Sequence, residues 1–135
     1  MPLCLSAGAI GAWVGVQTFT LAWMHSIEKI RWEEDWRVDR ASLQIVGARV
    51  RGTGAGMEPP PDAQFSNGAW HYTPSVGPQE TVLLAHSPYT AGYELCLSGA
   101  CRPLADWLPG IPDTATIVLR ACAAHAEDAA SRQGR

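Results

Sequence analysis

The sequence has few cysteines, few charges and no long unbroken hydrophobic run, and each shortage excludes a class of protein. Four cysteines among 135 residues are too few for a disulfide-dense miniprotein. Charged residues make up 17% of the chain, and 13 acidic against 10 basic side chains give a formal net charge of -3. This acidic balance excludes a nucleic-acid binder that works by bulk attraction to phosphates.

The opening segment lacks the features of a signal peptide and of a membrane span. The first charged residue is Glu28, so the basic region that precedes the apolar run of a secretory signal is missing. Glycine, glutamine and threonine also dilute the run below the roughly 20 apolar residues that a spanning helix needs. We therefore expect no direct membrane span, and the missing signal by itself favours a cytoplasmic location.

Tryptophan, glycine and proline are plentiful, with 6, 13 and 10 residues, which favours short strands and many turns. Residues of alternating polarity predict strands near 18–23, 30–38, 43–50, 70–73, 81–86, 92–97 and 116–121, and one helical turn near 104–108. We expect an all-β domain over residues 1–122, a small barrel or sandwich of about seven to nine short, mainly antiparallel strands. Residues 123–135 are expected to form a frayed helix or a disordered tail.

A carboxylate falls on a face that should be apolar. Alternation over 30–38 places Glu34 between Trp32 and Trp36. A hairpin closed at 39–42 would set Glu34 opposite Gly47, with Arg49 diagonally across, about 7 to 8 Å away at Cα. Glu34 is then either a ligand-binding or acid–base group between aromatic walls, or one half of a buried ion pair with Arg49.

Other polar residues near this strand are weaker candidates for a catalytic or metal site. His25 and Ser26 are adjacent on an expected strand and so point to opposite faces, which excludes a simple nucleophile and base pair. His25 with nearby carboxylates is a candidate divalent-metal site and the basis of an alternative function, a metal-assisted hydrolase. A run of acids beside arginines is more often a solvated face, so we expect no metal and no cofactor.

The glycine run of residues 52–56 is either an anion-binding nest or a tight loop that needs positive φ. It lacks the ending of a phosphate-binding P-loop.

The four cysteines allow three disulfide connectivities. Cys96 and Cys101 flank a stretch able to form a hairpin turn, so they would meet across two strands in an oxidising compartment. Cys4 and Cys122 lie near opposite chain ends, and terminal strands of small β domains are often neighbours. The sequence does not choose among the connectivities.

Three blocks resemble a known family. The segment 19–38, the segment 51–61 and the segment 93–97 are similar to the domain of unknown function 1850 family, with the most specific likeness in His-Ser-Ile-Glu at 25–28 and Gly-Ala-Gly-Met at 54–57. The likeness spans about residues 3–122. Members of this family are often encoded beside the permease of TAXI-type TRAP transporters, which take up small organic acids.

The resemblance implies a non-enzymatic binding or interaction module, an accessory component of such an uptake system. Its expected partners are a membrane permease and a small organic acid. Its expected location is periplasmic or membrane-associated. Relatives carry an N-terminal hydrophobic anchor, which this sequence does not show. One polar ligand site is expected, and an alternative role is a structural subunit that caps the permease. The expected site residues are His25, Ser26, Glu28, Glu34, Arg49, Gly54 and Gly56.

Overall fold

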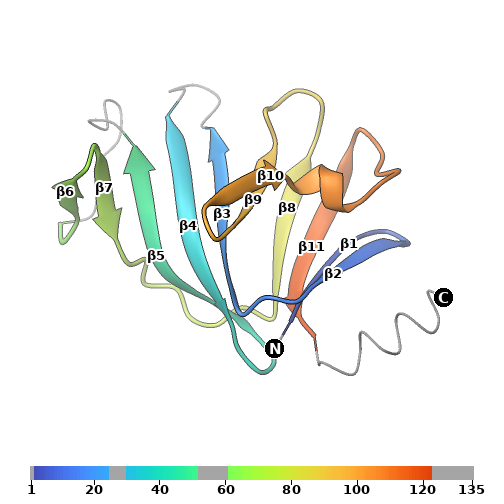
Figure 1. Ribbon diagram of the computed structural model, residues 1–135, viewed down its shortest axis with the longest axis horizontal. Coiled ribbons are helices and arrows are strands. Elements are labelled where there is room, and N and C mark those ends of the chain that lie inside the picture. Colours follow the sequence, from blue (N-terminus) through green and yellow to red (C-terminus); the bar gives the residue numbers. More distant parts are fainter. Residues whose placement is uncertain (1, 25–29, 52–60, 123–135) are drawn as a thin grey trace.

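Two antiparallel β-sheets face each other in the computed structural model, which describes residues 2–24, 30–51 and 61–122 (Figure 1). The four-stranded sheet has the order β2 (Ile10–Val14), β1 (Leu3–Ala7), β11 (Ala115–Ala121) and β8 (Thr81–His86). The seven-stranded sheet has the order β10 (Ala100–Pro103), β9 (Tyr93–Leu97), β3 (Thr18–Met24), β4 (Arg31–Val38), β5 (Leu43–Arg51), β7 (Ala69–Tyr72) and β6 (Gln64–Ser66). The prediction of an all-β barrel or sandwich is confirmed, and of the two the fold is the sandwich.

The described residues hold eleven strands, more than the seven to nine expected, because short strands flank the longer ones. The seven expected strands correspond to β3, β4, β5, β7, β8, β9 and β11. The 3₁₀ helix η1 (Leu104–Trp107) lies where one helical turn was expected. The expected C-terminal tail, 123–135, lies outside the described residues.

The core lies between the two sheets and is built from alternate residues of each strand. Leu3 and Leu5 of β1 and Ile117 and Leu119 of β11 are at most 1% exposed. They belong to one cluster with residues of the large sheet, among them Leu21 of β3. Alternate side chains of a strand point to opposite faces, so the large sheet has an inner face toward this core and an outer face away from it.

A β-bulge in β5 determines which side chains share a face of the large sheet. Trp36 pairs with Ile45 as expected, but Asp35 pairs with Gly47, so β5 contributes one extra residue, Val46. Val46 is 41% exposed. Beyond the bulge Glu33 faces Arg49, whereas the plain alternation predicted Arg49 to lie diagonally across from Glu34. The predicted register was wrong from this point, because one inserted residue turns every later side chain to the other face.

Both cysteine pairs named from the sequence are joined by disulfide bonds. Cys4 is bonded to Cys122, where the antiparallel neighbours β1 and β11 begin and end. Cys96 and Cys101 are directly opposite each other in the β9–β10 hairpin and form the second bond. The turn of this hairpin places Ser98 and Gly99 at φ of 51° and 85°, as a two-residue turn of this kind requires.

Within the described residues, no helix is long and apolar enough to cross a membrane.

The two disulfides are expected to contribute unequally to stability. Replacing Cys4 and Cys122 by serine should lower the free energy of unfolding by about 3–5 kcal/mol, because this bond closes a loop of 118 residues. The Cys96→Ser, Cys101→Ser variant should lose only about 2 kcal/mol, because its loop is short. Urea denaturation without reductant measures both values. Equal losses would contradict the loop-closure explanation.

Candidate functional site

The structure separates the two predicted site residues that it describes. Glu34 projects from the inner face of β4, whereas Arg49 projects from the outer face of β5, beside Glu33. The expected ion pair between Glu34 and Arg49 is therefore not formed. His25, Ser26, Glu28, Gly54 and Gly56, also predicted as ligand-binding residues, lie outside the described residues.

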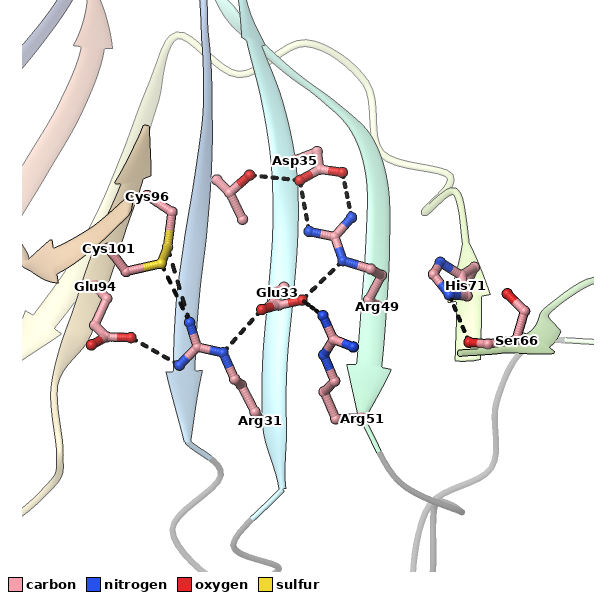
Figure 2. Close-up of polar contacts among 11 residues, drawn as sticks. Arg31, Glu33, Asp35, Arg49, Arg51, Ser66, His71, Glu94, Cys96 and Cys101 are labelled. Atoms are coloured by element: carbon pink, nitrogen blue, oxygen red, sulfur yellow. Dashed lines mark hydrogen bonds and ion pairs between the residues drawn. A yellow bond between two sulfur atoms is a disulfide. The ribbon is translucent and has the colours of Figure 1, made fainter. Parts of the chain in front are cut away.

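The outer face of the large sheet carries a connected set of ion pairs, the outer network, shown in Figure 2. It extends from β9 across β4 to β5. Its members are Arg31, Glu33, Asp35, Arg49, Arg51 and Glu94.

Three arginines converge on Glu33, which is 9% exposed. Arg31 Nε donates to Glu33 Oε2 at 2.9 Å, Arg49 Nε donates to Oε1 at 2.9 Å, and Arg51 Nη2 donates to Oε1 at 3.1 Å. Burial alone would raise the pKa of Glu33, but the hydrogen bonds from Arg49 and Arg31 and the charges of Arg51 and Arg49 hold that pKa below its usual value. Glu33 is therefore a fixed carboxylate at the centre of the network.

The remaining donors of Arg49 form a bidentate ion pair with Asp35. Arg49 Nη1 lies 2.6 Å from Asp35 Oδ2 and Arg49 Nη2 lies 3.0 Å from Asp35 Oδ1. The hydroxyl of Thr20 on β3 also donates to Asp35 Oδ1 at 2.7 Å. Burial opposes ionisation of Asp35, yet these contacts lower its pKa overall. A planar guanidinium that bridges two carboxylates in this way fixes the positions of β4 and β5 side chains.

A polar hollow of about 370 Å³ lies beside the network, between β5 and β7. Arg49, Asp35, Asp62 and His71 are among the residues that line it. The ring Nε2 of His71 is 3.1 Å from the carbonyl oxygen of Ser66. Because Arg49 already binds two carboxylates and Asp62 adds a third acid, this hollow is poorly suited to an anion.

On the inner face of the large sheet, aromatic side chains lie directly opposite one another on neighbouring strands and form a row across the sheet. Tyr93, Trp23 and Trp32 occupy paired positions on β9, β3 and β4. The ring centroids of Trp23 and Trp32 are 6.1 Å apart, and those of Trp23 and Tyr93 are 5.4 Å apart. The row continues through Val50 to Trp70. Glu34 lies in the next row, between Leu21 of β3 and Ala48 of β5.

Within the part of the chain that the structure describes, Glu34 has one hydrogen-bond partner, the indole of Trp36, whose Nε1 donates to Glu34 Oε1 at 3.2 Å. Among the described residues, no basic side chain forms an ion pair with it. Burial raises the pKa of Glu34, and the hydrogen bond from Trp36 offsets only part of this rise. The pKa values of Tyr72 and Tyr93 are raised by burial and, additionally, by the negative charge of Glu34.

A cleft of about 300 Å³ opens beside Glu34, and we call it the Glu34 cleft. It lies between the inner face of β4 and β5, the connection of residues 74–79, and β8. Its walls are mainly apolar, and its polar groups are Glu34, Gln79 and Thr81. An apolar cleft of this size with a few polar groups and a carboxyl of perturbed pKa has the usual features of a small-molecule site.

The outer network was not predicted from the sequence, because a run of acids beside arginines is typical of a solvated face. Two signals point to the network. Two acids and two arginines occupy alternate positions of β4, at 31, 33, 35 and 37, and β5 carries further arginines at 49 and 51. An isolated Gly47 inside an apolar strand is itself a typical indication of a bulge.

Within the ranges 2–24, 30–51 and 61–122, no three His, Cys, Asp or Glu side chains are grouped to hold a metal ion. The metal ligand proposed from the sequence, His25, lies outside these ranges.

Removing the carboxylate at the centre of the outer network should destabilise the protein. Glu33→Gln should lower the free energy of unfolding at pH 7 by roughly 2 kcal/mol, because three guanidinium groups lose a charged acceptor. The folded-state pKa of Glu33 is lowered, so its contribution is complete above its ordinary pKa and disappears as the pH falls through the folded value. The difference from wild type should therefore shrink in acid. Urea denaturation between pH 3 and pH 8, with the exposed Asp106→Asn as control, measures it, and a constant difference would contradict this view.

Glu34→Gln should have the opposite effect. The folded-state pKa of Glu34 is raised, so the native state favours the protonated form and loses stability as the pH rises through that pKa. Glutamine keeps an oxygen for the Trp36 indole without a buried charge. The free energy of unfolding at pH 7 should rise by about 1 kcal/mol and depend less on pH. A loss of stability at pH 7 would indicate an ionic partner for Glu34.

Comparisons with known proteins identify one family. No curated protein and no solved structure matches the chain. The sequence profile described as Domain of unknown function (DUF1850) matches residues 19–104, which run from β3 to the start of η1. The matched region contains the outer network and Glu34. The chain therefore belongs to the DUF1850 family.

Proposed function

We propose that the protein is a non-enzymatic binding module, an accessory component of a TAXI-type TRAP uptake system, and that it binds a small organic acid in the Glu34 cleft. The observation that carries the proposal is a half-buried carboxyl, without a cationic partner among the described residues, at the wall of an apolar cleft of about 300 Å³. The likeness of the sequence to proteins encoded beside such permeases supports the transport context.

The charge of Glu34 narrows the class of organic acid. A simple carboxylate would bring a second negative charge beside Glu34, which costs free energy in a partly dry site. An ammonium group would instead supply the missing cation and favour the ionised form of Glu34. We therefore propose an organic acid that carries an amino group, with its ammonium at Glu34 and its carboxylate toward the solvent-filled mouth of the cleft.

The walls of the cleft suit a short aliphatic body. Ile45, Val76, Val82 and Leu83 supply apolar surface from three separate segments. Val76 is 44% exposed, so its part of this surface is open to a ligand. Burial of a few methylene groups against these side chains would add roughly 0.8 kcal/mol for each group.

The disulfides support a location outside the cytoplasm. Both described cysteine pairs are bonded, one between β1 and the end of β11 and one across the β9–β10 hairpin. Such bonds form and persist in oxidising compartments and are rare in the cytosol. The periplasmic location implied by the family resemblance fits this chemistry better than a cytoplasmic location does.

Three five-carbon probes test the ligand class by isothermal titration calorimetry. Norvaline has both charged groups, pentylamine has only the ammonium, and valerate has only the carboxylate. Norvaline and pentylamine should bind and valerate should not. Glu34→Gln should weaken binding of the first two probes roughly tenfold, because the ion pair is lost.

Asp106→Asn removes an exposed acid on η1 and should leave binding unchanged. Binding of valerate that is as strong as binding of norvaline, or binding that is insensitive to Glu34→Gln, would refute the assigned site. Co-purification with a TRAP permease in detergent tests the accessory role separately, and its absence would refute that role.

A further inference from the structure

The two disulfides lie in different surroundings. Cys122 is 4% exposed, and Cys4, its partner, is only partly exposed. Cys101 lies on the exposed strand β10, at the edge of the large sheet, whereas its partner Cys96 is 6% exposed. An external reagent therefore has access to one sulfur of the second bond, that of Cys101.

A cation of the outer network lies beside this second bond (Figure 2). Arg31 Nη2 is 3.6 Å from Cys101 Sγ and 4.0 Å from Cys96 Sγ. The same guanidinium is held in place by Glu33 at 2.9 Å and by Glu94 at 2.8 Å. Arg31 is thus fixed next to both sulfurs by carboxylates on two strands, β4 and β9.

We propose that Cys101 is a modification site for low-molecular-weight thiols, which form a mixed disulfide with it while Cys96 leaves as a thiolate beside Arg31. The incoming thiolate forms a bond to Cys101 Sγ, and the electron pair of the Cys96–Cys101 bond departs with Cys96. One thiolate is consumed and one is produced, so no further oxidant or reductant is required. The reverse attack by Cys96 restores the original bond and releases the thiol.

Arg31 assists this exchange through charge. A thiolate that is released at a nearly buried position is costly unless a cation compensates for it. The guanidinium already lies within contact distance of the leaving sulfur, so no rearrangement is needed as the charge develops. Within the described part of the chain, Arg31 forms ion pairs with Glu33 and Glu94, and these pairs partly neutralise both carboxylates.

The fold is expected to survive the exchange. The Cys96–Cys101 bond links adjacent strands that are also joined by their own backbone pairing. β9 is paired on its other side with β3, which keeps it in the sheet. The bond between Cys4 and Cys122 is remote from this hairpin in the strand order and serves as an internal reference.

The test follows the reaction of the intact, oxidised protein with 2-mercaptoethanol at pH 8, quenched with N-ethylmaleimide and analysed by peptide mass spectrometry. The mixed disulfide should appear on Cys101 and the free thiol on Cys96, at least tenfold faster than any reaction at Cys4 or Cys122. Adduct formation on Cys96, or equal rates for both bonds, would overturn the proposal.

Variants then test the part played by Arg31. Arg31→Gln should slow the exchange about tenfold, and Arg31→Lys should restore most of the rate because it keeps the charge. Arg37→Gln is the matched control on the same strand, since Arg37 pairs with Asp39 and not with the disulfide. An unchanged rate in Arg31→Gln would refute the assisting role.

Glu94→Gln is a control for a general loss of structure in the outer network. It removes one negative charge beside Arg31 but keeps an oxygen that accepts from Nη1, and Glu33 still holds Nε. The guanidinium should therefore stay beside the sulfurs, and exchange should be as fast as in wild type or faster. Slower exchange in this variant would contradict the proposal. The rate at Cys4–Cys122, measured in each sample, should stay low in every folded variant.

Discussion

One extra residue in β5 determines the chemistry of both faces of the large sheet. Because Val46 is inserted opposite the junction of Asp35 and Trp36, Arg49 is turned to the outer face and meets Glu33 and Asp35. Without this bulge Arg49 would have pointed inward and neutralised Glu34. The same irregularity therefore completes an ion-pair network on one face and leaves a carboxyl without a cation, among the described residues, on the other.

Three consecutive acids of β4, residues 33–35, differ in their electrostatic states. Glu33 and Asp35 have lowered pKa values because arginines donate to them, whereas Glu34 has a raised pKa because burial is offset only by an indole. Structural ion pairs stabilise the folded state above the ordinary carboxyl pKa, and an uncompensated acid destabilises it in the same range. The outer face of the large sheet therefore carries structural ion pairs, and the inner face carries the acid at which we place the ligand.

Sequence patterns predicted the parts of the fold that depend on strict alternation. The strands β3, β4 and β5, the placement of Glu34 between tryptophans, and the turn between Cys96 and Cys101 all follow from the spacing of apolar residues and turn residues. The position of Arg49 did not, because a bulge changes the face of a residue without changing the strand assignment. The contacts of Arg31 with Glu94 and with the disulfide join residues more than 60 positions apart, and no local pattern specifies such pairings.

The ends of the large sheet have a consequence for the behaviour of the protein in solution. Its edge strands are β10, with four residues and a terminal Pro103, and β6, with three exposed residues. Both are folded back by tight hairpins, at Ser98–Gly99 and at Asn67–Gly68. Long, flat edges recruit strands from other molecules, whereas short edges with proline do not. A wide sheet can thus remain dispersed at high concentration, without growing by edge-to-edge aggregation.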